Sequence, residues 1–180
     1  MTEELSTFLY YYHNGVSTHA YEFLGCHPEN RDGVDGFVFR VWAPNATEAF
    51  VVGDFNGWTE SDPMVRITDA GIHECRISAD RFGEGSVYKY KFNTPNGERY
   101  KADPYAAGAE LPPATASVYH DIDTYQWRDG GWMEHRRRRM VQTAEEYLET
   151  PIHIYELHAA SLFRHADGGY PTYRELAEML

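Results

Sequence analysis

The chain has few cysteines and few basic residues, and each shortage argues against a class of protein. Its two cysteines, Cys26 and Cys75, lie far apart in 180 residues without CxxC spacing, so neither a metal site nor a disulfide framework is indicated. Lysine and arginine number 16 against 28 aspartates and glutamates, which gives a formal net charge of −12. Such a charge repels phosphate backbones and anionic headgroups, so nucleic acids and membrane surfaces are not expected as partners.

Long hydrophobic runs are also missing. No stretch approaches the ~20 apolar residues of a membrane-spanning helix. The N-terminal MTEELSTFLYYYHNG lacks the basic start and apolar centre of a secretion signal. We therefore expect a cytoplasmic protein whose cysteines are free, partly buried thiols.

Aromatic side chains are abundant, at 15% of the residues, with 14 tyrosines and four tryptophans. Two explanations stay open. Strands favour aromatic residues, and the flat C–H faces of sugar rings stack on aromatic planes. Trp42, in a strand-like stretch next to a proline, is predicted to be a core residue.

A period of two dominates the sequence from Gly36 onward. In GFVFRVWAP apolar residues alternate until Pro44 ends the run. The stretches TEAFVVGDF, GIHECRIS and SVYKYKFN repeat this pattern between turn-forming residues. Asn96-Gly97 is typical of a hairpin turn. Short strands between turns predict an antiparallel β-sandwich over residues 36–123.

The segments on either side of the predicted sandwich have other patterns. Residues 1–35 are predicted to be a helical and loop lead-in, because STHAYEFLGCHP has apolar residues at helical spacing that end at Gly25 and Pro28. Residues 124–150 are polar and include four successive arginines, Arg136 to Arg139. We interpret this stretch as a charged, solvated linker.

Residues 151–180 predict the start of a parallel α/β fold. Apolar residues run almost without interruption from Ile152 to Leu157, as in a strand buried on both faces. Thr172 lies three residues before Glu175, the signature of a capping box, and a helical apolar stripe follows. One βα unit needs further units to satisfy its edges, so we expect either a longer native chain or a partner that supplies them.

Several motifs together carry a resemblance to a known family. They are, in chain order, FRVWAPNATEAFVVGDFNGW, YKYKF, KADPYA, PPATAS, PIHIYELH and TYRELAEML. In this order they resemble the N-terminal carbohydrate-binding module of glycogen (1,4-α-glucan) branching enzymes and the start of the catalytic barrel behind it. The resemblance begins at about His13. GDFNGW alone is less specific, because related modules precede debranching enzymes and trehalose-releasing hydrolases and occur in the glycogen-binding β subunit of a nucleotide-regulated protein kinase.

The resemblance implies a mainly β fold and a glycosyltransferase reaction. An immunoglobulin-like β-sandwich would be followed by a linker and the first βα unit of an incomplete (β/α)8 barrel of the α-amylase type. The family's reaction cleaves an α-1,4 glucan and transfers the piece to a 6-hydroxyl as an α-1,6 branch. Its two catalytic carboxyl groups would stand on later barrel strands. We therefore assign no catalytic residue, metal or cofactor, and expect the chain itself to bind glucan without catalysis.

Three glucan-binding residues are implied by the resemblance. Trp58 closes the GDFNGW turn at a loop tip, where its ring can stack on glucose. A lysine of the YKF motif is expected to assist, and we place this role on Lys89. Tyr100, three residues before Asp103-Pro104, matches a second aromatic position but offers a smaller platform than tryptophan. The structural alternatives are a lid on the sandwich edge for Trp58, a solvated charge for Lys89 and packing for Tyr100.

Other functions remain open beside the branching-enzyme prediction. A stand-alone glycogen-binding targeting module, an inactive truncated product and the N-terminal part of a trehalose-releasing hydrolase are the alternatives, although KADPYA and TYRELA favour branching. Glu156 and His158 share a predicted strand face like a catalytic pair, but the resemblance gives them a supporting role and we assign them no site. The sequence leaves branch length and oligomeric state open.

Overall fold

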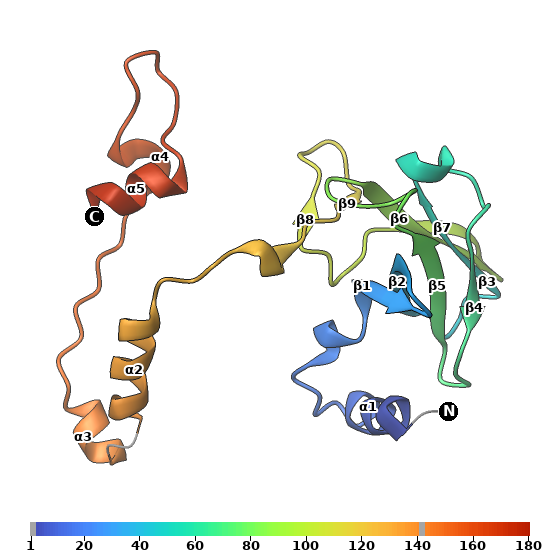
Figure 1. The fold of residues 1–180 in the computed structure, drawn as a ribbon, viewed down its shortest axis with the longest axis horizontal. Helices are drawn as coiled ribbons and strands as arrows, with labels where there is room; N and C mark the ends of the chain where they lie inside the picture. Colours follow the sequence, from blue (N-terminus) through green and yellow to red (C-terminus); the bar gives the residue numbers. More distant parts are fainter. Residues whose placement is uncertain (1–2, 141–142) are drawn as a thin grey trace. The chain divides into compact units, whose positions relative to one another are not determined.

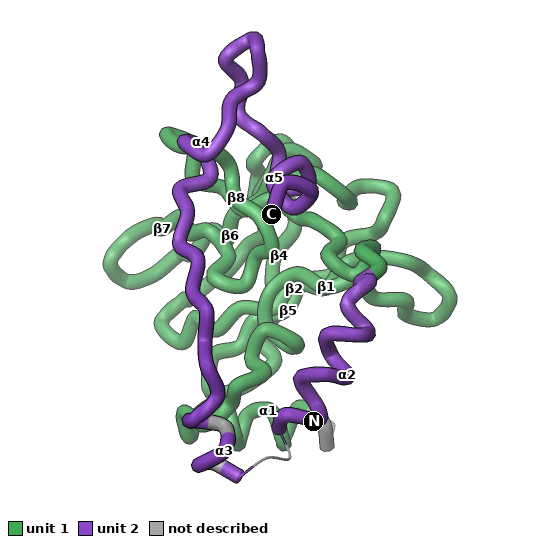
Figure 2. Tube along the Cα trace, turned by 90° about the vertical axis from the view of Figure 1, so that its left-hand side faces the viewer, with its two compact units in different colours: residues 1–126 green, residues 127–180 purple. Residues whose placement is uncertain are grey.

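The computed structural model describes residues 3–140 and 143–180. Two compact units, Met1–Gln126 and Trp127–Leu180, divide the chain (Figure 2). The elements of the first unit are α1 (Glu3–His13), η1 (Ala20–Glu22), β1 (Gly25–Arg31), β2 (Val34–Trp42), β3 (Glu48–Gly53), η2 (Asp54–Asn56), β4 (Pro63–Arg66), β5 (Ile72–Ser78), β6 (Val87–Thr94), β7 (Gly97–Lys101), β8 (Gly108–Ala109), β9 (Ser117–Val118) and η3 (Ile122–Thr124), where η denotes a 3₁₀ turn. The second unit contains α2 (Gly130–Arg139), α3 (Ala144–Leu148), α4 (Ala159–Leu162) and α5 (Tyr173–Met179).

The strands of the first unit form a curled antiparallel sheet (Figure 1). Its order is β1-β2-β5-β4-β3-β6-β9-β8, and β7 pairs with β6 outside this path. Strand β4 joins the two halves, because Val65 pairs with β5 whereas Met64 pairs with β3. The fold is therefore mainly β, and the halves enclose a core as the layers of a β-sandwich do.

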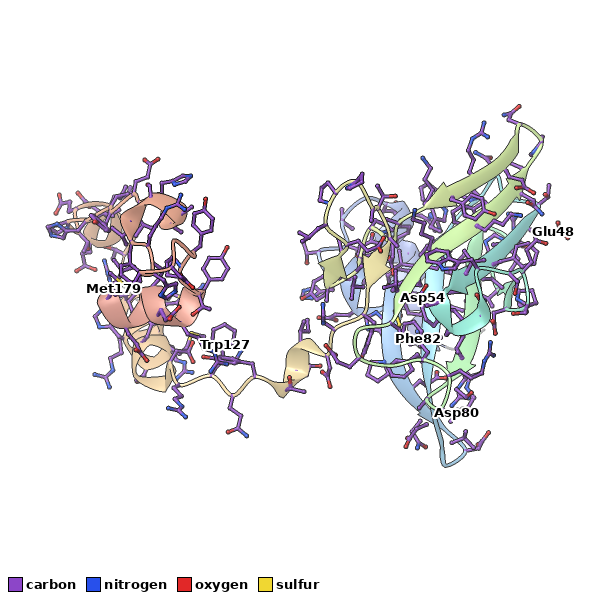
Figure 3. All side chains as sticks on the ribbon, turned by 90° about the horizontal axis from the view of Figure 1, so that it is seen from above. Glu48, Asp54, Asp80, Phe82, Trp127 and Met179 are labelled. Atoms are coloured by element: carbon purple, nitrogen blue, oxygen red, sulfur yellow. The ribbon has the colours of Figure 1, made fainter. Side chains whose placement is uncertain are left out.

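Alternating side chains of the strands fill this core. Phe39 of β2, Val51 of β3 and Tyr90 of β6 are fully buried. Phe82, labelled in Figure 3, enters from the loop after β5, and its ring lies edge-on to Phe39 with centroids 4.9 Å apart. Edge-to-face aromatic pairs stabilise a core beyond the area that they bury. The aromatic residues of the sequence are thus used largely for packing in this unit.

Most of the predicted strands are confirmed. The four alternating stretches named above contain β2, β3, β5 and β6, and a hairpin joins β6 to β7. The predicted helix before them is wrong, because only the short turn η1 forms and Gly25–Arg31 is strand β1. This strand pairs with β2 along its whole length, Cys26 opposite Phe39. The open edge of β2 thus overrides a short helical pattern, and the sheet begins before the predicted boundary at residue 36.

Trp42 is not a core residue. The alternation that buries Val41 turns Trp42 to the outer side of β2, where it is 46% exposed. Its indole Nε1 donates a hydrogen bond to the carbonyl oxygen of Ala70 (2.8 Å), and its ring lies edge-on to Tyr12 of α1. A strand residue next to a proline can therefore cover the outer face instead of filling the core.

The second unit confirms one element of the predicted βα pattern. Helix α5 begins at the predicted capping box, in which the Glu175 backbone NH donates to Thr172 Oγ1 (3.3 Å) and the Glu175 carboxylate accepts from the Thr172 backbone NH (2.7 Å). The predicted strand from Ile152 to Leu157 is not formed, and Ile154 is 88% exposed. A strand buried on both faces needs neighbouring strands, and the described residues of this unit contain none.

The segment predicted as a charged linker contains two helices, α2 and α3. The arginine run lies at the end of α2, where Arg137 and Arg138 are exposed and pair with Glu134 at 2.6 and 3.1 Å. Arg136, Arg137 and Arg138 are thus exposed to solvent and Arg139 is half-buried, although the backbone of the run is helical. Within residues 3–140 and 143–180, none of the helices has the length and apolar composition of a membrane span.

Candidate functional site

Two of the predicted site residues lie on the outer side of strands β6 and β7. Side chains alternate along a strand, so the tyrosines of β6 fill the core while Lys89 and Lys91 point away from it. The strand register places Phe50 of β3, Lys91 of β6 and Tyr100 of β7 opposite one another. Directly opposed residues share a face, so these three side chains form one row across the sheet.

Trp58 lies on a fixed turn, and Glu60 of the loop after it contacts Lys91 of this row. It follows η2, which starts where β3 ends, and its indole Nε1 donates to Asp54 Oδ1 at 2.8 Å. Its backbone NH donates to the carbonyl oxygen of Gly53 (2.9 Å). The side chain is 40% exposed. The turn therefore orients the ring while part of its surface stays open to a ligand.

Lys91 connects the turn of Trp58 with Tyr100. Its ammonium bonds to Glu60, which belongs to the loop after Trp58, and to Glu98 of β7 at 3.0 Å. The same Nζ lies 5.6 Å from the centroid of the Tyr100 ring, which is 49% exposed. The hydrogen bonds that the ammonium donates to Glu60 and Glu98 raise the pKa of Lys91. Lys91 therefore stays charged, with an ion pair to the loop that follows Trp58 and a cation–π contact to Tyr100.

Lys89, the lysine named in the sequence analysis, has another partner. Its ammonium donates to Thr115 Oγ1 at 2.8 Å, in the loop between β8 and β9. The sequence analysis did not name Lys91, although the sequence contained the signal. The triplet Tyr-Lys-Phe within YKYKF spans Tyr90 to Phe92. Lys91 is the lysine of that motif, and it is the one that contacts Tyr100.

The arrangement can bind a ligand by stacking and hydrogen bonding. Trp58 and Tyr100 offer exposed rings, and the exposed carboxylates of Glu60 and Glu98, which Lys91 holds from beneath, can accept hydrogen bonds from hydroxyl groups. Among the residues that the structure describes, no three histidine, cysteine, aspartate or glutamate side chains gather as a metal site would require. Glu156 and His158 lie in an irregular segment, where His158 Nδ1 contacts Ser161 Oγ at 3.2 Å.

Comparisons with known proteins agree with this fold. Residues 23–106 match the family model of carbohydrate-binding module 48 (isoamylase N-terminal domain). The chain is 41% identical over 178 residues to the 1,4-alpha-glucan branching enzyme GlgB of Francisella philomiragia, 41% over 174 residues to that of Bacillus subtilis and 44% over 172 residues to that of Rhodospirillum rubrum. These alignments cover 96%, 96% and 92% of the chain but 26%, 26% and 22% of the relatives. The chain thus spans about a quarter of the length of the curated relatives it matches.

Two pullulanases are among the solved structures that match part of this chain. The Anoxybacillus sp. LM18-11 enzyme complexed with maltotetraose has a TM-score of 0.47 and 22% identity, over 61% of this chain and 16% of that one. The D350A mutant from Paenibacillus barengoltzii complexed with maltotriose has a TM-score of 0.46 and 25% identity, over 62% of this chain and 16% of that one.

The family match and the fold coincide along the chain. The matched residues 23–106 include strands β1 to β7, which build most of the curled, immunoglobulin-like sheet. Identity to the branching enzymes extends over both units. Residues 23–106 are thus similar to carbohydrate-binding module 48, and the chain as a whole is similar to the N-terminal part of the 1,4-alpha-glucan branching enzymes.

Proposed function

We propose that this chain supplies glucan binding to a 1,4-α-glucan branching enzyme, through the surface formed by Trp58, Lys89, Lys91 and Tyr100, called here the aromatic face. The proposal is carried by one observation: the exposed Tyr100 ring contacts Lys91, and Lys91 bonds to Glu60 in the loop that follows the exposed Trp58, on the outer side of a carbohydrate-binding module. Sugar rings stack on such platforms, and neighbouring charged groups bond their hydroxyls. A neutral α-1,4 glucan is also unaffected by the net charge of −12, which would repel an anionic ligand.

The catalytic role belongs, in this proposal, to a longer protein. Its reaction would be the cleavage of an α-1,4 chain and its transfer as an α-1,6 branch. Residues 151–180 would then be the first βα unit of the barrel, with the apolar run from Ile152 forming a strand once other strands flank it. Helix α5 supports this, because its capping box is already in place while Tyr173 and Leu180 remain exposed. The free thiols Cys26 and Cys75 fit a cytoplasmic location.

Replacing Trp58 with alanine should remove most glucan binding. We expect the unmodified chain to bind in the high micromolar to millimolar range, which corresponds to about 4 to 5 kcal/mol. Because the ring is 40% exposed, its removal should change stability little. Affinity electrophoresis in glycogen gels measures this as a loss of retardation. Trp132→Ala, which alters an exposed tryptophan of α2, is the matched control, and equal retardation of Trp58→Ala and the unmodified chain would show that Trp58 is structural.

The same gels distinguish the contributions of the two lysines of β6 to glucan binding. Lys91→Ala should reduce retardation more than Lys89→Ala, because Lys91 contacts the Tyr100 ring and Lys89 contacts Thr115. The opposite order would return the assisting role to Lys89.

The 180-residue chain should neither branch nor hydrolyse glucan. The reaction needs a nucleophilic carboxylate and an acid/base carboxyl on later barrel strands. Amylose incubated with the purified chain and then stained with iodine should keep its absorption spectrum, while the full-length Bacillus subtilis enzyme serves as the positive control. A spectral shift with accumulation of α-1,6 linkages would contradict this prediction, and Glu156 and His158 would then be the first residues to replace.

A further inference from the structure

We propose that Asn56, Asp62 and Arg81 form a positioning network that holds Trp58 in its ligand-binding orientation, so that Arg81 controls glucan affinity without belonging to the aromatic face. This inference rests on the proposed function of Trp58. It makes Arg81 a positioning residue, because Arg81 acts through the turn and not on the sugar.

The backbone of Trp58 needs such support. Its φ is 62°, in the left-handed region, and Gly57 before it has a φ of 63°. Glycine adopts this region freely, whereas a bulky residue such as tryptophan does so rarely. A strained conformation of this kind persists only where the surroundings over-determine it. The residues that fix the turn are therefore the ones that keep the indole in place.

Asn56 ties both ends of this turn together. Its Oδ1 accepts a hydrogen bond from the backbone NH of Gly53 (3.0 Å), at the end of β3. Its Nδ2 donates to the carbonyl oxygen of Val51 (2.9 Å) and to Asp62 Oδ2 (2.8 Å). One amide thus connects strand β3, where the turn begins, with the residue that ends the following loop.

Arg81 fixes the far end of that loop from a different part of the chain. It follows β5, and its two terminal nitrogens donate to the two oxygens of Asp62, both at 2.8 Å. Asp62 is 7% exposed, and its carbonyl oxygen also accepts from the backbone NH of Val51 (3.0 Å). A bidentate pair of this type fixes geometry as well as charge. The guanidinium lies 5.9 Å from the ring centroid of Phe55, a residue of η2, so Arg81 contacts both the loop and the turn.

The charge on Asp62 keeps this network closed. Burial acts to raise the pKa of Asp62, but hydrogen bonds from Arg81 and Asn56 outweigh it and lower the pKa. The carboxylate is therefore ionised near neutral pH and accepts hydrogen bonds from both partners. If Arg81 is removed, the loop loses its anchor and must be ordered when the glucan binds, which weakens affinity.

The test compares three arginine variants of the full chain by isothermal titration with maltoheptaose. Arg81→Met, which keeps the aliphatic stem, should weaken binding about 3- to 10-fold, as expected when a few loop residues must be ordered on binding. Arg81→Lys, which restores the charge but not the bidentate geometry, should fall between Arg81→Met and the unmodified chain. Arg31→Met is the matched control, because Arg31 pairs with Glu29 on β1, away from the turn.

A second readout reports on Trp58 without any sugar. With 5-fluorotryptophan incorporated, ¹⁹F NMR should give one signal for each of the four tryptophans, and the signal missing in Trp58→Phe belongs to Trp58. In Arg81→Met this signal should shift or broaden while the other three stay in place. Affinity and a Trp58 signal that both match those of the unmodified chain would overturn the proposal.

Two further outcomes are also decisive. If Arg81→Met loses the far-ultraviolet circular dichroism of the β fold, Arg81→Lys decides the question by the same two measurements. If glucan binding proves insensitive to Trp58→Ala, the proposed function fails, whereas the ¹⁹F signals still show whether Arg81 holds the indole.

Discussion

Asp103→Ala should destabilise the first unit by about 4 kcal/mol, because it leaves several buried hydrogen-bond donors without a partner, each worth about 1 to 3 kcal/mol. The carboxylate of Asp103 is buried. Its Oδ2 accepts from the hydroxyls of Tyr88 (2.8 Å) and Tyr90 (3.1 Å), and its Oδ1 accepts from the backbone NH of Tyr105 (2.9 Å). Both hydroxyls belong to core rings, so solvent cannot easily replace the lost acceptor.

Urea denaturation of the full chain, followed by near-ultraviolet circular dichroism, measures this loss. The rescue variant Tyr88→Phe/Tyr90→Phe/Asp103→Ala should recover part of it, because the two hydroxyls that lost their acceptor are removed as well. A midpoint for Asp103→Ala within error of the unmodified chain would show that the tyrosine hydroxyls find other partners.

The same carboxyl should also make stability depend on pH. Burial raises the pKa of Asp103, although hydrogen bonds from Tyr105, Tyr88 and Tyr90 oppose this effect. The folded state then holds the proton more tightly than the unfolded state. The contribution of this group is therefore complete below the ordinary aspartate pKa of about 3.9 and decreases as the pH rises through the folded pKa. The Asp103→Ala variant should lack this decrease.

The sequence predicted strands best where the two faces of a strand carry different side chains. Strands β2, β3, β5 and β6 alternate between core and outer side chains, and this local pattern predicts a strand without knowledge of its neighbours. Strand β1 has no such pattern, since GCHPENR is mostly polar. Its structure comes from pairing with the edge of β2, a contact that no local window contains. The strand predicted for the run from Ile152 is not formed for a related reason: a strand buried on both faces requires neighbouring strands.

The candidate site shows how a register decides between two lysines. Lys89 and Lys91 are two residues apart and therefore point to the same face of β6, so periodicity cannot distinguish them. The sequence analysis placed the lysine of the YKF motif at Lys89, whereas the structure opposes Lys91 to Tyr100. A shift of one residue in a hairpin changes every cross-strand partner. The contact of Lys91 with Glu60 could not be predicted from a local pattern, because Lys91 lies on β6 and Glu60 lies in a loop 31 residues earlier in the chain.

Gly53→Ala should destabilise the first unit by about 3 kcal/mol, near the upper end of what overpacking costs. The reason is space and not backbone conformation, since the φ of Gly53 is −177°, an extended value that any residue adopts. A Cβ at this position would lie 2.2 Å from the carbonyl oxygen of Val87 and 2.7 Å from the Phe55 ring. The first of these atoms belongs to the backbone of β6, which cannot move without disturbing its ladder with β3.

Gly57→Ala is the matched control for this close approach. No atom lies within 4 Å of a Cβ at Gly57, but its φ of +63° is unfavourable for alanine, so it should cost about 1 kcal/mol. Equal urea midpoints for the two variants would show that the backbone of β6 moves to accommodate the methyl group added by Gly53→Ala.

The backbone NH and carbonyl of Gly53 also bond to Asn56 and Trp58, so displacement of Gly53 moves the turn that presents the indole. Gly53→Ala should therefore lower glycogen retardation even under conditions where the variant is fully folded, whereas a glycine needed for packing alone would lower only the urea midpoint.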